Sequence, residues 1–270
     1  MRYVVSAVLA IILMAAETAY PYSGNGLRGD VSVEVLSDQG NTLLTVPHRD
    51  LRKGATRITK QYVEARKGER YSIVIRNRKA ERIGVVVAVD GRNIISGKRS
   101  DLRSTEDMYL VNAYDQGRYD GWRTDQDSVH RFYFTDPGDS YSMRTFSDAS
   151  SMGVIAVAAY REKDRPRPRQ EEIRGQESAP AAPSGSIAER SKSLAARDEA
   201  AGTGFGESQF SPTYMVAFDP ERTPFQKTLV KYEWREVLCR KGIVHCGTGS
   251  GSRLWDEGEY APYPPAYRRN

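Results

Sequence analysis

Carboxylates are plentiful among the side chains of this chain that could take part in catalysis. Glycoside hydrolysis needs two of them at a defined separation across a cleft. The acidic residues considered for such a role are Asp90, Asp107, Asp115, Asp120, Asp125, Asp136 and Asp139. TDPGDS (135–140) lacks the spacing of a calcium-binding loop and indicates an ordinary turn. Because sequence does not measure separation in space, an acid pair for hydrolysis and solvated loop acids both remain open.

Three histidines and two cysteines limit the nucleophilic and metal chemistry. His48, His130 and His245 lie far apart, and no serine lies in a G-x-S-x-G motif, so a nucleophile–base pair would depend on the fold alone. A site made of Cys239, His245 and Cys246 would lack the fourth ligand of a structural zinc. We therefore expect no metal or other cofactor. In an exported protein the two cysteines predict a disulfide, with unpaired thiols as the alternative.

Two glycine-rich stretches resemble phosphate-binding loops in composition only. GTGFGE (202–207) and GTGSGS (247–252) lack the G-x-G-x-x-G spacing, and neither joins a predicted strand to a helix in a βαβ unit. We expect GTGSGS to be a flexible connector and GTGFGE to be structural, with a phenylalanine that could fill a groove. In AVDGRNIISG (88–97), Asp90-Gly91 predicts a tight hairpin turn rather than a ligand site.

Aromatic side chains are better candidates for recognition. The polar stretch 98–122 carries Tyr109, Tyr114, Tyr119 and Trp122 among Asp, Asn and Arg residues. Exposed rings offer apolar area with little loss of entropy, which suits stacking on sugars or recognition of a protein. These four residues form the predicted partner-binding site, and the alternative is that their rings cover an edge of a sheet.

Strands are the elements that must position these residues. Short runs of β-branched and aromatic residues are separated by turn signals and show no helical period, which predicts an all-β fold, an antiparallel β-sandwich. The expected strands are residues 31–36, 41–46, 55–65, 69–77, 81–90, 129–135 and 152–160. The excursion 98–122 should either cross between the sheets or form a surface loop.

A change in composition divides the remainder of the chain. The expected segments are a signal peptide or anchor at 1–19, the sandwich domain at 28–162, a disordered Pro/Ala/Arg-rich linker at 163–204, a β-β-α segment at 205–246 and a flexible tail at 247–270. The β-β-α segment contains predicted strands at 212–218 and 226–234 and a predicted helix at 234–243. Because its core is too small to stand alone, we expect it to pack on the sandwich as an appendage and to add strands to a sheet edge.

The amino terminus indicates export. Arg2 precedes an uncharged apolar run, Val4 to Ala16, which has the length of a signal peptide and is short for a spanning helix. The expected location is the periplasm or the extracellular space. No clean small-x-small cleavage site follows, so an uncleaved anchor is the alternative. Lys and Arg exceed Asp and Glu by only 40 to 35 and are interspersed with them, which argues against a nucleic-acid partner.

Several motifs together resemble those of a protein family. AVDGRNIISG, DGWR (120–123), FYFTDPGDSY (132–141), GVIAVAAYREK (153–163) and GTGFGE are similar to motifs of a group of uncharacterised exported proteobacterial β-sandwich proteins. The resemblance implies export and a shared fold, and it assigns no functional residues. The expected function is a non-enzymatic binding or structural module of the bacterial envelope, with an envelope protein or carbohydrate as partner. A carboxylate-dependent hydrolase of envelope sugars or peptides is the alternative.

Overall fold

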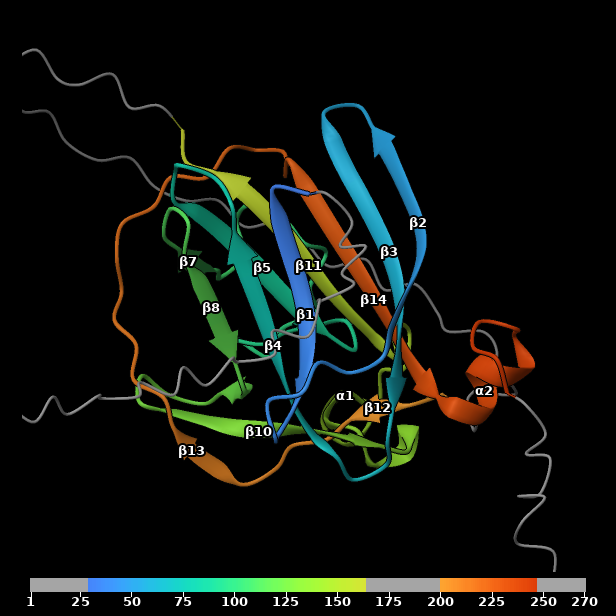
Figure 1. Ribbon diagram of the computed structural model, residues 1–270. Coiled ribbons are helices and arrows are strands. Elements are labelled where there is room, and N and C mark those ends of the chain that lie inside the picture. The colour runs from blue at the N-terminus through green and yellow to red at the C-terminus, as the bar shows by residue number, and fades with distance from the viewer. Residues whose placement is uncertain (1–28, 164–199, 247–270) are drawn as a thin grey trace, which may run out of the picture.

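The computed structural model describes residues 29–163 and 200–246, which form two sheets of seven strands packed as a sandwich (Figure 1). The predicted mainly β fold is therefore confirmed. The expectations for the signal peptide, for most of the linker and for the tail fall on residues 1–28, 164–199 and 247–270, outside the described residues.

The first sheet is built around β4 and β10. Its strands are β1 (Val31–Ser37), β4 (Arg70–Asn77), β8 (Gln116–Tyr119), β9 (Gly121–Arg123), β10 (Ser128–Thr135), β12 (Gly202–Thr203) and β13 (Ser208–Phe210). β4 pairs with β1, β8 and β10, and β10 also pairs with β9, β12 and β13. In β1, buried residues alternate with partly exposed ones, as expected when one face of a strand covers a core.

The second sheet is more continuous. Its strands are β2 (Thr45–Lys53), β3 (Thr56–Ala65), β5 (Ile83–Val89), β6 (Arg92–Asn93), β7 (Tyr109–Val111), β11 (Val154–Arg161) and β14 (Gln226–Trp234). Their order is β2-β3-β14-β11-β5-β6, with β7 also beside β5. Every residue of β5 is buried, because Leu102 and Met108 from the long excursion pack on a second apolar cluster containing Val86.

The carboxy-terminal segment is not an appendage at a sheet edge. β14 lies between β3 and β11, parallel to β3 and antiparallel to β11, and the other described strand pairs are antiparallel (Figure 1). The segment is part of the sandwich, but β14 is an internal strand of the second sheet rather than an addition to its edge. Of its two predicted strands, 226–234 forms and 212–218 does not. A nine-residue strand with neighbours on both sides is part of the main core rather than an addition to it.

Two further expectations about strands are refined. The predicted strand 41–46 begins only at Thr45, because residues 41–44 carry the chain from the first sheet to the second. The excursion 98–122 does cross between the sheets: β7 pairs with β5 in the second sheet, and β8 pairs with β4 in the first.

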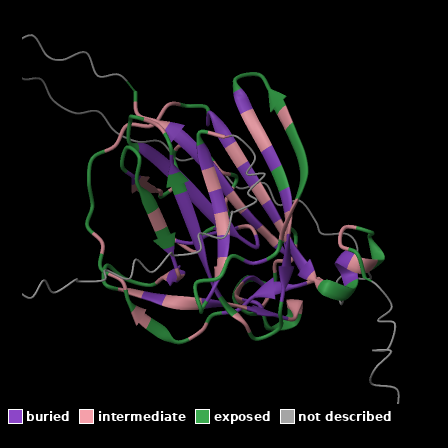
Figure 2. Ribbon diagram, viewed as in Figure 1, coloured by how far each residue is buried: buried purple, intermediate pink, exposed green. Residues whose placement is uncertain are grey.

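Helices are short in the described part of the chain. They are the 3-10 helix η1 (Pro137–Asp139), α1 (Tyr141–Phe146) and α2 (Arg235–Arg240). α2 confirms the helix predicted at 234–243. In the described part of the chain, no helix is both long and apolar enough to cross a membrane. Figure 2 shows the interior strands buried and the outer strand β2 largely exposed.

Candidate functional site

Asp90 and Gly91 form the predicted hairpin turn between β5 and β6. Their φ angles are 48° and 79°, and Val89 pairs with Arg92 across the turn. Positive φ at both central residues is the property of a type I′ turn, and aspartate tolerates it better than most residues. The turn directs the Asp90 carboxylate into the sandwich, where only 1% of the residue is exposed.

Donors surround the Asp90 carboxylate. Its Oδ1 accepts hydrogen bonds from the Gly153 amide at 2.8 Å and from the Tyr232 hydroxyl at 2.5 Å. Its Oδ2 accepts one from the Thr203 amide at 2.8 Å. The Thr203 hydroxyl oxygen lies 2.6 Å from that of Tyr232 and 2.7 Å from that of Tyr71. This chain of polar groups, the Asp90 network, joins five segments that are distant in sequence.

Burial controls the ionisation of the Asp90 network. It raises the pKa of Asp90 to about 6, because desolvation penalises the carboxylate more than the surrounding donors stabilise it. Burial also raises the pKa of Tyr71 and Tyr232, so both hydroxyls stay protonated and able to donate. Both tyrosines and Thr203 are fully buried. We assign the network a structural role, because its side chains are buried and none of them lines either of the two pockets described below.

Two of the four predicted aromatic site residues belong to the core. Trp122 is 2% exposed, and its indole Nε1 donates to the Gly204 carbonyl at 3.0 Å. Tyr119 is buried as well. The prediction that these rings are exposed is wrong, because β8 and β9 are strands of the first sheet and direct them inward.

The other two predicted aromatic residues are separated by the fold. Tyr109 is half-buried, its ring lies 4.5 Å from that of Tyr119, and its hydroxyl accepts from Arg123 Nε at 2.7 Å. Tyr114 is 73% exposed. The structure therefore brings Tyr109 and Tyr119 together as cover for the core and leaves Tyr114 at the surface.

The three histidines occupy separate places. His48 lies on β2 and makes an edge-to-face contact with Tyr62. His130 lies on β10, as expected for a strand, and stacks on Phe205 with 4.1 Å between ring centroids. His245 is exposed after α2. Within the described residues, no group of three or more His, Cys, Asp or Glu side chains is placed to hold a metal ion.

The predicted acids do not gather in one pocket. Asp90 is buried in its network, whereas Asp120 accepts hydrogen bonds from Ser72 and Arg118. Asp136 pairs with Lys67 and lines the larger of the two pockets described below. None of the other predicted acids lines either of these two pockets.

GTGFGE is structural, as expected. A β-carbon on Gly204 would lie 2.1 Å from the Tyr133 ring, so any other residue there would force that ring to move. Phe205 stacks between His130 and Tyr141, with a 5.2 Å centroid distance to the latter. The linker prediction is wrong for residues 201–204, which are buried because β12 pairs with β10.

The carboxy-terminal helix is held by a disulfide and by ion pairs. Cys239 and Cys246 form the predicted disulfide, with Cα atoms 5.4 Å apart. Arg235 of α2 donates to buried Glu64 at 2.7 Å. Lys241 donates to Glu233 of β14 at 2.6 Å, and this second glutamate is buried too. The two ion pairs fix α2 to the end of the second sheet, and the disulfide joins α2 to the residues that follow it.

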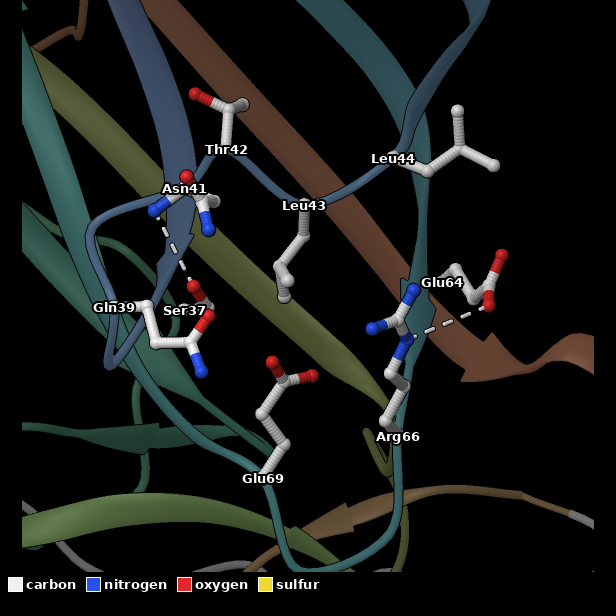
Figure 3. A pocket seen from close by; sticks show the side chains of 9 residues that line it. All are labelled: Ser37, Gln39, Asn41, Thr42, Leu43, Leu44, Glu64, Arg66 and Glu69. Carbon is white, nitrogen blue, oxygen red and sulfur yellow. Dashed lines mark hydrogen bonds and ion pairs between the residues drawn. The ribbon is translucent and has the colours of Figure 1, made fainter.

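A pocket of about 250 Å³ opens where the chain leaves β1 for the second sheet (Figure 3). It is lined by Ser37, Gln39, Asn41, Thr42, Leu43, Leu44, Glu64, Arg66 and Glu69. A second pocket of about 410 Å³ shares Glu64 and Arg66 with it and is also lined by Trp234. Neither pocket was predicted from the sequence, because both form from loops and strand ends whose residues carry no shared pattern.

Residues 211–219, here called the strap, carry an exposed apolar surface. The exposed fractions are 85% for Tyr214 and 92% for Met215, and Val216 is exposed as well. Phe210, immediately before the strap, is 76% exposed. Figure 1 shows this chain as the orange coil that leaves β13 and runs along the outside of the sandwich toward β14.

Both ends of the strap are anchored. At the first end, Arg123 donates to the Ser211 carbonyl at 2.9 Å, and the Thr213 amide donates to the Gln126 carbonyl at 2.8 Å. At the other end, the Lys163 amide donates to the Asp219 carbonyl at 2.8 Å. Within the described part of the chain, the backbone amides of residues 214–216 have no hydrogen-bond partner. The central residues of the strap are therefore exposed to solvent, while hydrogen bonds hold both of its ends in place.

Comparison with protein-family models, with curated proteins and with solved structures finds no match for this chain. The resemblance to exported proteobacterial proteins stays a prediction.

Proposed function

We propose that this protein is an exported, non-enzymatic binding module of the bacterial envelope that recognises another protein through the strap. The observation that carries the proposal is the exposure of Tyr214 and Met215, in a segment outside helices and strands that is anchored at both ends. The apolar amino-terminal run supports export.

The strap has the chemistry of a protein-binding surface. Aromatic residues and methionine are enriched in the cores of protein interfaces, where their burial contributes much of the affinity. Phe210 and Tyr214 supply two such rings beside Met215. Fixed ends reduce the conformational entropy that binding would otherwise remove. The unpaired amides of residues 214–216 also allow a partner strand to add to the strap.

Site-specific photo-crosslinking in intact cells tests the proposal. A photoreactive phenylalanine analogue at Met215 should form a discrete adduct with a second envelope protein. The same analogue at Tyr114, which is 73% exposed on another loop, is the matched control and should form none. Replacing Phe210 and Tyr214 by alanine should abolish the adduct at 215, because these rings supply the neighbouring contact area.

Two results would count against the proposal. An absence of adducts at 215 in the exported protein would exclude the strap as the binding surface. Recovery of the whole protein in the cytoplasm would exclude an envelope role. Mass spectrometry of the mature amino terminus then separates cleavage near residues 17–20 from an intact anchor.

A further inference from the structure

We infer that the pocket between the β1–β2 connection and the start of β4 is a binding site for one ring of a neutral carbohydrate. The site is independent of the strap and uses none of its residues. Figure 3 shows the side chains of Gln39, Arg66 and Glu69 around the open space, with the Glu69 carboxylate directed between the other two.

The pocket is built on backbone that hydrogen bonds hold in place. The Ser37 amide donates to the Asn41 carbonyl at 2.8 Å, and the Gly40 amide donates to the Ser37 carbonyl at 2.9 Å. On the opposite side, the Glu69 amide donates to the Arg66 carbonyl at 3.0 Å, and the Glu69 carbonyl accepts from the Phe134 amide at 3.0 Å. The polar side chains therefore project from two fixed turns, which lowers the entropy cost of binding.

Polar groups of the pocket lack partners. Glu69 Oε2 is buried and has no hydrogen-bond partner among the described residues. A buried acceptor left unpaired costs about 1–3 kcal/mol, so a ligand hydroxyl that donates to it gains affinity. Within the same part of the chain, the side-chain amides of Gln39 and Asn41 also have no partner. Each amide offers donors and an acceptor.

Charge and size favour a neutral sugar ring. Glu64 pairs with Arg66 at 3.8 Å and with Arg235 at 2.7 Å, so two arginines accompany the two lining glutamates, Glu64 and Glu69. The lining is thus close to neutral overall, which disfavours an ion. Hydroxyl groups both donate and accept, and so match unpaired amides beside an unpaired carboxylate oxygen. A volume of about 250 Å³ equals roughly eight water molecules at ~30 Å³ each, which is room for a single ring.

The adjoining pocket extends the site. Because it shares Glu64 and Arg66 with the first and is lined by Trp234, the next ring of an oligosaccharide can lie against the indole. Leu43 and Leu44 supply apolar surface in the first pocket for the C–H groups of the bound ring. The geometry therefore favours a chain of sugars over a free monosaccharide.

Saturation-transfer NMR and isothermal titration calorimetry on the folded protein test the inference. The probes are the trisaccharides of N-acetylglucosamine, cellulose and maltose, with triglycine amide as a neutral non-sugar. At least one trisaccharide should bind at millimolar concentration or below, and triglycine amide should not. Glu69→Gln should weaken that binding about tenfold, because a hydrogen bond to a neutral amide oxygen is weaker than one to a carboxylate, here by about 1.4 kcal/mol.

Two further variants distinguish a loss of binding from a loss of folding. Leu44→Arg changes a side chain that is 52% exposed at the pocket, so it should block binding without lowering the melting temperature. Glu34→Gln, on β1 outside the pocket lining, should leave binding unchanged. Binding of no trisaccharide, equal binding of triglycine amide, or unaltered affinity in both Glu69→Gln and Leu44→Arg would overturn the assignment.

Discussion

Asp90 shows how a single residue can serve both a local turn and the whole core. Its positive φ follows from the hairpin sequence, whereas its carboxylate meets Tyr232, which is 142 positions away. The Asp-Gly pair predicted the turn, because turn preferences depend on adjacent residues. The buried contacts of its side chain were not predictable, since they depend on how distant segments pack.

Stability should depend on pH through Asp90. Its pKa is about 6 in the folded protein against 3.8 for the unpaired group, so folding favours the protonated form. The stabilisation of the folded protein by protonated Asp90 is complete below pH 3.8 and is lost as the pH rises through about 6. A shift of about two units corresponds to about 3 kcal/mol.

Asp90→Asn provides the reference, because asparagine does not titrate. Denaturant unfolding of both proteins should show the stability of the natural chain rising relative to the variant between pH 6 and pH 4. Taking the difference removes the opposite contribution of Asp38, Asp50 and Asp148, whose pKa values are lowered by neighbouring arginines or hydrogen bonds. A pH-independent difference would contradict the prediction.

At the scale of elements, β1 illustrates how a sheet edge is closed without another strand. β1 pairs with a named strand, β4, on one side only, and the end of its other side bridges to Thr42 and accepts from the Leu43 amide. On its other side, the Gln226 side chain accepts from the Val31 amide at 3.2 Å and donates to the Val31 carbonyl at 2.5 Å. Gln61 donates to the Val33 carbonyl at 3.2 Å. An edge satisfied in this way does not recruit strands from other molecules.

Gln226→Leu should destabilise the protein by about 2–4 kcal/mol, because it leaves both polar groups of Val31 buried without partners. Gln61→Leu is the matched comparison and should cost about half as much, since it removes one hydrogen bond. Urea unfolding gives the free energies, and amide hydrogen exchange locates the loss. Faster exchange at Val31 in the Gln226 variant alone is expected, and equal effects of the two variants would argue against this explanation.

For the whole molecule, β14 makes the sandwich dependent on both ends of the described chain. It pairs along its full length with β3 and for six residues with β11, and it contributes Val230 and Tyr232 to the core. We expected this region to be an appendage because two strands and one helix make too small a core to stand alone. The position of β14 between distant strands makes it integral instead.

A chain ending at residue 163 should therefore fail to fold cooperatively, because β3 and β11 would each lose a neighbour. Near-ultraviolet circular dichroism reports whether the truncated chain has fixed tertiary packing, and thermal unfolding reports whether it unfolds cooperatively. The control is the full chain cut by a protease site placed within residues 164–199. If noncovalent contacts hold β14 in place, the cut protein should keep its unfolding transition. A cooperative transition in the truncated chain would show that the sandwich forms without β14.

The sequence by itself determined the strand-rich fold class, the Asp90-Gly91 turn, the helix α2 and the Cys239–Cys246 disulfide. It also determined the positions of seven of the fourteen described strands, namely β1, β3, β4, β5, β10, β11 and β14. These features depend on alternation, turn chemistry and close spacing, which are local. Only the tertiary structure decided that Trp122 is buried, that the strap is exposed and that β14 enters the sheet parallel to β3. The physical reason is that burial and strand pairing are properties of segments brought together from more than a hundred residues apart.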